Sequence, residues 1–232
     1  LHVHREEDGH QGVGDLREEP RGCVAHYDKT EDYYTVYTAM QRAHAFKSEL
    51  AQIARVNESK VRVIGGDIGG SFGMKSAVYN EVPLAMLASK LIGRPVKWKS
   101  TRSEAFLSDA QARDNVTEAE LALDKDGNFL GVRVKLIAAT GAYCQPGMPN
   151  FTSNVNSIAG VYRTPAIFAD VIAVYTHTNP VRPYRGNGRP EAAYVIERMV
   201  DLAARETGID PAELRRRNYI PPAAMPFKTG LT

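Results

Sequence analysis

The spacing of apolar residues along the chain switches repeatedly between a period of two, typical of strands, and a period near 3.6, typical of helices. Because strand-like and helix-like segments are mixed without strict alternation, we expect an α+β fold with helices layered on a mixed β-sheet. The alternating segments predict strands over 22–27, 33–38, 61–64, 96–99, 116–123, 129–138 and 167–176. The helical segments predict helices over 43–55, 81–92 and 190–207, and a short one that starts at Asp210.

The two ends of the chain lack this periodicity. Residues 1–19 are polar, so we expect a flexible tail there rather than a metal site built from its histidines. Ordered structure is expected to begin near Pro20 and to form one subdomain over 20–220. Residues 221–232 contain three prolines and are interpreted as a linker to a further, C-terminal part of the same subunit.

Composition and charge are those of an ordinary globular protein. The 232 residues are 43% hydrophobic and 24% charged, which is enough to bury a core. A net charge of +2 favours neither nucleic acid nor a membrane surface as a partner. No apolar run reaches the roughly 18 residues that a membrane span needs, so the cytoplasm is the default location.

Two cysteines, Cys23 and Cys144, are too few for a disulfide framework or for a zinc or iron–sulfur site within the chain. We therefore predict no metal ligated by these side chains, and any iron–sulfur centre would have to lie on another domain or subunit. Cys144 falls in an irregular stretch over 140–157 and has no recognised spacing to any histidine. Nucleophilic catalysis is accordingly disfavoured.

The densest glycine segment is 65–75, GGDIGGSFGMK, which lies between a predicted strand and a predicted helix. This order lets backbone N–H groups approach a ligand closely. A phosphate-binding loop that starts at Gly69 would need a glycine where Met74 stands, and no register supplies the glycines of the dinucleotide fingerprint. Nucleotide binding is thus disfavoured, and a tight turn without a ligand is the alternative.

A second glycine-containing loop, over 179–189, precedes the helix that starts at Pro190.

Four segments occur in an order typical of one family: EPRG at 19–22, the segment around Gln41, GGSFGMK at 69–75 and YRGNGRPE at 184–191. Together they resemble the molybdenum-binding large subunit of the xanthine dehydrogenase / aldehyde oxidase / aerobic carbon monoxide dehydrogenase family, the molybdenum hydroxylases. The resemblance extends from about residue 19 to residue 226. Each segment alone is a weak signal, whereas the four in this order are a strong one.

The resemblance implies an oxidoreductase that hydroxylates carbon with oxygen derived from water. The metal is held by a pyranopterin dithiolene, as molybdopterin or its dinucleotide form, and a molybdenum-bound hydroxyl attacks the substrate while a hydride passes to a sulfido ligand. Electrons then leave through iron–sulfur clusters to FAD on partner domains or subunits. The chain would correspond to the first molybdenum-cofactor-binding subdomain.

The resemblance also assigns roles to individual residues. Gln41 matches a glutamine that hydrogen-bonds an oxo ligand, and Arg185 matches an arginine beside cofactor and substrate that stabilises negative charge. Both would be catalytic, and Ser76 would face the substrate. Without the resemblance, Gln41 could be a surface amide, Phe72 a core aromatic and Arg185 a surface ion-pair partner. The cofactor-binding residues implied are Gln41, Gly70, Ser71, Phe72, Gly73 and Arg185.

The chain departs from the family pattern at informative positions. Ser76 stands where xanthine-oxidising members carry a purine-binding glutamate, and Gly186 stands where true carbon monoxide dehydrogenases carry a copper-holding cysteine. Met74 replaces a usual glycine. The catalytic glutamate of the family belongs to a downstream segment that these 232 residues do not include.

We therefore expect part of a molybdenum hydroxylase large subunit that oxidises an aldehyde or an N-heterocycle, and that is inactive as this fragment alone. One alternative is a large subunit similar to carbon monoxide dehydrogenase. Another is a non-catalytic binding or assembly module whose glycine loops are only turns. A nucleotide-binding protein is disfavoured because of Met74.

Overall fold

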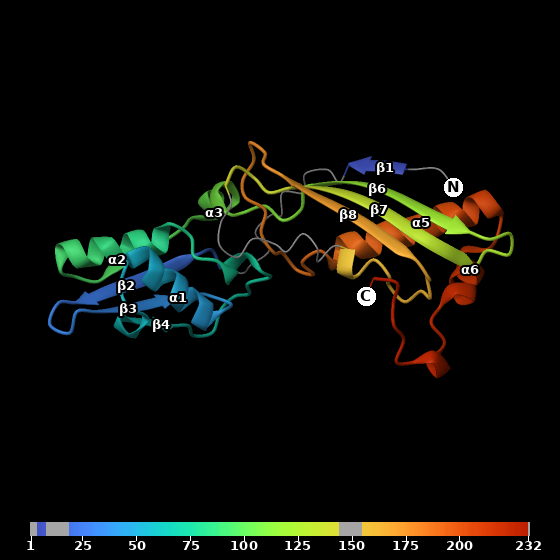
Figure 1. Cartoon of the computed structure of the whole chain (residues 1–232). Coiled ribbons are helices and arrows are strands. Elements are labelled where there is room, and N and C mark those ends of the chain that lie inside the picture. Colours follow the sequence, from blue (N-terminus) through green and yellow to red (C-terminus); the bar gives the residue numbers. More distant parts are fainter. Residues whose placement is uncertain (1–3, 8–18, 144–154, 232) are drawn as a thin grey trace. The chain divides into compact units, whose positions relative to one another are not determined.

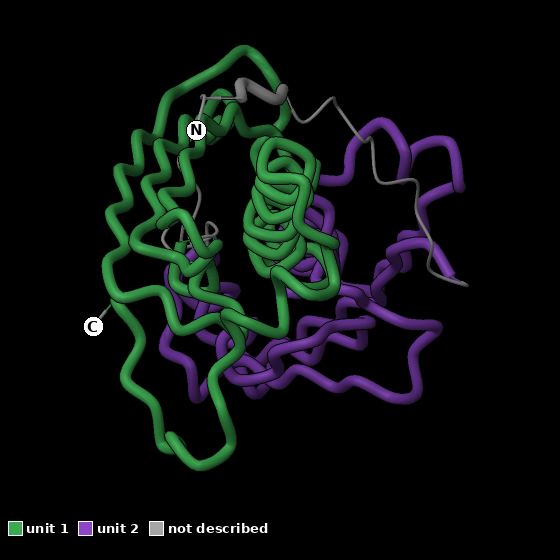
Figure 2. The backbone as a smooth tube through the Cα atoms, turned by 90° about the vertical axis from the view of Figure 1, so that its right-hand side faces the viewer, with its two compact units in different colours: residues 1–11, 111–232 green, residues 12–110 purple. Residues whose placement is uncertain are grey.

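The computed structural model describes residues 4–7, 19–143 and 155–231. It has an α+β fold, as expected, with helices packed on mixed sheets (Figure 1). The chain divides into two compact units, Gly12–Ala110 and a second formed by Leu1–Gln11 with Gln111–Thr232 (Figure 2). The sequence indicated a single subdomain over 20–220, and the boundary between Ala110 and Gln111 falls within that span.

The unit Gly12–Ala110 contains a four-stranded sheet in the order β4-β3-β2-β5. Strand β3 pairs with β4 in parallel, and the other two pairings are antiparallel. The strands are β2 (Gly22–Asp28), β3 (Tyr33–Thr38), β4 (Val61–Ile64) and β5 (Val96–Lys99). The predicted strands are confirmed to within one residue.

Helices α1 (Ala43–Ala54) and α2 (Glu81–Ile92) bury their apolar residues against this sheet. Gly93 ends α2 in the left-handed conformation, at φ 65°, as a glycine after a helix commonly does. Between β5 and the end of the unit lies α3 (Arg102–Ser108), which the periodicity did not reveal. The unit also contains two short 3-10 helices, Glu58–Lys60 and Met74–Ser76.

The other unit contains a sheet in the order β1-β6-β7-β8, in which β7 and β8 are parallel and the other pairs antiparallel. Helix α5 packs on one face of this sheet through a core that includes Leu121, Val134, Ile196 and Val200. The elements are β1 (His4–Glu7), β6 (Asn115–Leu123), β7 (Phe129–Ala139), β8 (Ile167–Val174), α5 (Arg189–Thr207), α6 (Pro211–Asn218) and the 3-10 helix Pro222–Ala224.

Two expectations about the chain ends change. A strand, β1, lies within the segment 1–19 that we expected to be without regular structure, because its backbone pairs with β6 rather than through any apolar pattern of its own. A 3-10 helix likewise occurs in the expected linker 221–232. Cys144 and most of the irregular stretch 140–157 lie outside the described residues, as do His2 and His10.

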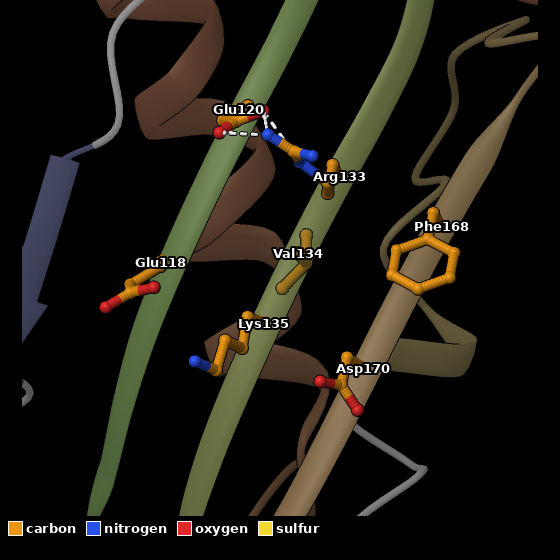
Figure 3. A pocket seen from close by; sticks show the side chains of 7 residues that line it. All are labelled: Glu118, Glu120, Arg133, Val134, Lys135, Phe168 and Asp170. Carbon is orange, nitrogen blue, oxygen red and sulfur yellow. Dashed lines mark hydrogen bonds and ion pairs between the residues drawn. The ribbon is translucent and has the colours of Figure 1, made fainter.

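The outward face of the β6–β7–β8 sheet is charged, and a shallow pocket of about 220 Å³ lies on it (Figure 3). Glu118, Lys135 and Asp170 are neighbours across the three strands, so their charges alternate in sign. Beside them, Arg133 donates two hydrogen bonds of 2.7 and 2.6 Å to the Glu120 carboxylate. Each of the two cations thus has a carboxylate beside it on a neighbouring strand, which is typical of a solvated sheet face rather than of a reaction site. In the described parts of the chain, no helix has the length and apolar composition needed to cross a membrane.

Candidate functional site

The glycine loop after β4 has a backbone that only particular residues adopt. Gly70 and Gly73 have φ values of 93° and 99°, and Phe72, which carries a side chain, has φ 51°. A Cβ atom on Gly70 would lie 2.7 Å from the Phe72 ring, so this position requires glycine. A positive φ is costly for a bulky residue and is found mostly where the surrounding structure and function require it. The loop is therefore a specifically built feature.

Gln41 is attached to this loop by its side chain and its backbone. Its Oε1 accepts hydrogen bonds from Ser71 Oγ at 2.7 Å and from the Gly73 backbone N–H at 3.1 Å. Its backbone N–H donates to the Lys75 carbonyl at 3.0 Å. The structure thus brings together Gln41, Ser71 and Gly73, three of the residues that the sequence assigns to the cofactor.

Lys75 ends the loop as a buried cation. It is only 2% exposed, and its Nζ lies 2.9 Å from Glu19 Oε1. The hydrogen bond from Lys75 lowers the pKa of Glu19, although partial burial opposes the shift. Sequence reasoning used Glu19 only as a motif position and gave it no role. The signal that could have revealed it is the need of a buried lysine for a carboxylate partner.

Ser76, assigned to the substrate, is 8% exposed. Its carbonyl accepts hydrogen bonds from Arg42 Nη2 at 3.0 Å and Nε at 3.3 Å. A groove of about 460 Å³ lies in the same unit, and its lining includes Glu19, Tyr37, Asp67 and Lys99. Gln41, Phe72 and Ser76 are not among the residues that line this groove.

The second loop lies in the other unit and begins α5. Gly186 has φ 98°, and a Cβ atom there would lie 2.5 Å from Cδ and Cγ of Pro190. Asn187 has φ 42°, and its N–H donates to the Tyr184 carbonyl at 2.8 Å. Gly188, at φ 87°, is the N-cap of α5 and offers no side-chain cap. The N–H groups of the first turn of α5 therefore lack a side-chain acceptor from the N-cap.

Arg113 supports this loop from the segment before β6. Its Nη2 donates to the Arg185 carbonyl at 3.0 Å, and its Nε lies 3.2 Å from Glu191 Oε1. Its guanidinium also lies 5.6 Å from the centre of the Tyr184 ring. Glu191 Oε2 and Tyr184 Oη are buried and have no hydrogen-bond partner within the described residues. Buried polar atoms without partners are rare and costly, so a ligand is a natural source of the missing partners.

Arg113 was not identified from the sequence, because nothing in its immediate neighbours distinguishes it from a surface arginine. Arg185, by contrast, was identified by its motif, and its side chain is exposed. Among the described residues, no group of three or more histidine, cysteine, aspartate or glutamate side chains is arranged to ligate a metal.

Comparison with known proteins gives a consistent result. The profile of the family described as "Molybdopterin cofactor-binding domain" matches residues 3–219. The carbon monoxide dehydrogenase large chain of Hydrogenophaga pseudoflava is 38% identical over 212 residues, covering 90% of this chain and 26% of that protein. Subunit gamma of the 6-hydroxypseudooxynicotine dehydrogenase complex of Paenarthrobacter nicotinovorans is 35% identical, covering 92% of this chain and 27% of that protein.

Among solved structures, quinoline 2-oxidoreductase from Pseudomonas putida 86 superimposes with a TM-score of 0.91 at 34% identity. The match covers 99% of this chain and 30% of that one. The chain thus spans about a quarter of the length of the curated relatives that it matches first.

Proposed function

The chain belongs to the molybdopterin cofactor-binding domain family, and we propose that it is part of the large subunit of a molybdenum hydroxylase. The observation that carries the proposal is the attachment of Gln41 to the left-handed glycine loop through Ser71 and Gly73. A turn without a ligand would not need an exposed amide attached to it by two hydrogen bonds, nor a phenylalanine at positive φ. These features disfavour the reading of the loops as mere turns.

The residues present fit a pterin-bound metal. The first loop has a left-handed backbone at Gly70, where a Cβ atom would lie 2.7 Å from the Phe72 ring, so its N–H groups are not covered by a side chain at that position. The second loop contains buried polar atoms, Glu191 Oε2 and Tyr184 Oη, that lack partners among the described residues. Donor and acceptor groups of a pterin could supply them. When bound, the molybdenum cofactor would supply the oxidation of a substrate carbon with oxygen from water.

Each protein group then has a defined task. Gln41 would offer a neutral amide to the cofactor, and the backbone of Phe72 and Gly73 would help to hold it. Arg185 provides a permanent positive charge near the substrate, where it stabilises developing negative charge. Arg113 holds the Arg185 carbonyl and the Glu191 carboxylate and so keeps the second loop in place.

For the substrate we propose an aldehyde or an N-heterocycle. Ser76 offers no carboxylate of the kind that the resemblance assigns to purine binding. Quinoline 2-oxidoreductase, which is named for an N-heterocycle, is among the similar structures. The runner-up is carbon monoxide oxidation, favoured by the likeness to the Hydrogenophaga large chain. Against it, a cysteine in place of Gly186 would bring its Cβ 2.5 Å from Pro190, so this loop is not shaped for a copper-holding thiol.

We also propose iron–sulfur and flavin subunits or domains as partners, together with the rest of the large subunit. These 232 residues contain two cysteines, which cannot ligate the clusters that the electron path requires. The fragment alone is accordingly expected to be inactive, and substrate turnover by purified 1–232 would contradict this.

The decisive experiment is metal analysis of the complete protein copurified with its partners. We expect about one molybdenum atom per large subunit, released together with a pterin on denaturation. A matched sample from cells that cannot make the pterin cofactor should contain none. Protein from cofactor-competent cells that is folded, bound to its partners and free of molybdenum would refute the proposed function and leave a non-catalytic assembly module.

A further inference from the structure

The orientation of the Gln41 side-chain amide can be deduced from the chemistry of its neighbours. The Gly73 backbone N–H lies 3.1 Å from the amide and can only donate a hydrogen bond. The amide atom that faces it must therefore be the oxygen, Oε1. It follows that the NH₂ group, Nε2, is turned away from the glycine loop.

Ser71 adds a second constraint in the same direction. Its hydroxyl accepts a hydrogen bond from the Lys75 backbone N–H at 3.2 Å, which leaves its single proton for Gln41 Oε1 at 2.7 Å. Ser71 is 9% exposed, so water competes little for this proton. The Lys75 carbonyl in turn accepts from the Gln41 N–H at 3.0 Å. The side chain and the backbone of Gln41 are thus both held by the same five-residue loop segment.

The donor group of Gln41 has a different environment. Gln41 is exposed, and within the described part of the chain the hydrogen bonds of its side chain are the two that Oε1 accepts, from Ser71 and Gly73, so that Nε2 makes none. The side chain therefore presents two N–H donors outward from the loop while its acceptor is already occupied. An amide free to rotate would offer either end to a ligand with similar probability.

We propose that Ser71 is a positioning residue that fixes Gln41 with its NH₂ group toward the cofactor, so that Gln41 acts on an acceptor atom of that group. The inference rests on the proposed function, because it takes the exposed side of Gln41 to be the cofactor side. In this role Ser71 acts through Gln41, and the cofactor contact that the resemblance implies for Ser71 is a separate prediction that this role does not require. If Ser71 were purely structural, its hydroxyl would only support the loop backbone, through the hydrogen bond that it accepts from the Lys75 N–H.

A double-mutant cycle in the complete enzyme separates these roles. We expect Ser71→Ala to lower kcat about tenfold in the natural background, the loss that one orienting hydrogen bond of about 1.4 kcal/mol produces. In the Gln41→Ala background, Ser71→Ala should lower kcat less than twofold, because the side chain that it positions is gone. An equal loss in both backgrounds, or a loss below twofold in the natural one, would overturn the proposal.

Two further variants give a readout other than activity. Gln41→Glu keeps an oxygen for Ser71 and Gly73 but replaces the outward donor with an acceptor. We expect it to retain its molybdenum and to change the EPR spectrum of the reduced metal, and an unchanged spectrum with full kcat would contradict the claim. Ser71→Thr keeps the hydroxyl and should restore the natural spectrum that Ser71→Ala alters. If the natural enzyme contains no molybdenum, the proposed function fails and this inference fails with it. If the enzyme contains molybdenum at full occupancy but the effects of Ser71→Ala and Gln41→Ala on kcat are additive, only this inference is overturned.

Discussion

Replacement of Arg21 by methionine would remove a buried cation that joins three elements of the unit Gly12–Ala110. Arg21 is 6% exposed and donates to Asp109 at 2.6 Å, to Glu81 at 2.8 Å and to Ser108 at 2.7 Å. Its guanidinium also lies 3.9 Å from the centre of the Tyr79 ring. Burial alone lowers the pKa of Arg21, but the hydrogen bond to Glu81 and the charge of Asp109 outweigh burial and raise it.

The magnitude follows from what the substitution leaves behind. Methionine fills much of the same space, but the buried carboxylate of Asp109, 8% exposed, would lose the Arg21 guanidinium that lies 2.6 Å from it. Breaking a buried ion pair in this way costs about 3–5 kcal/mol. Since a domain is stable by only about 5–15 kcal/mol, the unit should be close to its limit of stability. With a slope of about 1.5 kcal/mol per M, the urea midpoint should fall by roughly 2–3 M.

Urea denaturation followed by tryptophan fluorescence measures this effect directly. Trp98 is the single tryptophan of the chain, lies in the same unit and has Arg21 5.4 Å from its ring centre. The matched control is Lys60→Met, which also replaces a cation by methionine. Lys60 is 42% exposed in its side chain and lies 3.9 Å from Asp32, so its loss should cost less than about 1 kcal/mol.

A further variant tests the cause rather than the size of the loss. Adding Asp109→Asn to Arg21→Met removes the buried carboxylate charge that has lost Arg21 and should recover at least about 1 kcal/mol. If Arg21→Met and Lys60→Met shift the midpoint equally, or if Asp109→Asn makes the double variant less stable, the reasoning from buried charge is wrong.

Three other predictions concern single sites. Asn218 is 1% exposed, and its side chain makes three hydrogen bonds to backbone groups. Asn218→Ala should therefore lower the free energy of unfolding, measured by calorimetry, by about 3 kcal/mol, and a loss below about 1 kcal/mol would show that those groups find other partners. The pKa of Glu19 is lowered in the folded state by Lys75, so its contribution to stability is present above the unfolded pKa and is lost as pH falls through the folded value. Thermal unfolding should therefore become more sensitive to pH below about 4.5 in the natural protein than in Lys75→Met, and parallel pH profiles would contradict this. Gly186→Ala places a Cβ atom against Pro190 at a positive φ, and it should lower both the free energy of unfolding and the molybdenum content. Gly66→Ala is the matched control, because a Cβ atom at Gly66 would meet no atom within 4 Å.

Most secondary structure followed from local sequence. Helix α2 runs from Glu81 to Ile92, as the apolar spacing and Gly93 with Pro95 predict, because the residues that end a helix act within one turn of it. Helix α3 was missed because its seven residues are too few for a period to be recognised, although Thr101 and Glu104 form a capping box at its start. Strand β1 was missed because its hydrogen bonds are to β6, which is more than a hundred residues away.

The candidate site divides in the same way. Gln41, the loop from Gly70 to Gly73, and Arg185 were identified from sequence, since their motifs are contiguous and their order along the chain is informative. Their roles toward cofactor and substrate remain predictions. The roles of Arg113 and of the Glu19 carboxylate became visible only in the structure, because their partners are distant in the sequence. Arg113 pairs with Glu191, 78 residues later (191 − 113), and Glu19 pairs with Lys75, 56 residues later (75 − 19).

The sequence by itself therefore determined the α+β class, the positions of most elements and the family. Each of these depends on residue types at short spacing or on the order of motifs. Only the tertiary structure decided that Gln41 lies with its oxygen toward Ser71 and Gly73, and that Lys75 is buried against Glu19. A hydrogen bond requires two atoms within about 3 Å and in the right direction, and that geometry between distant segments is set by packing of the whole unit.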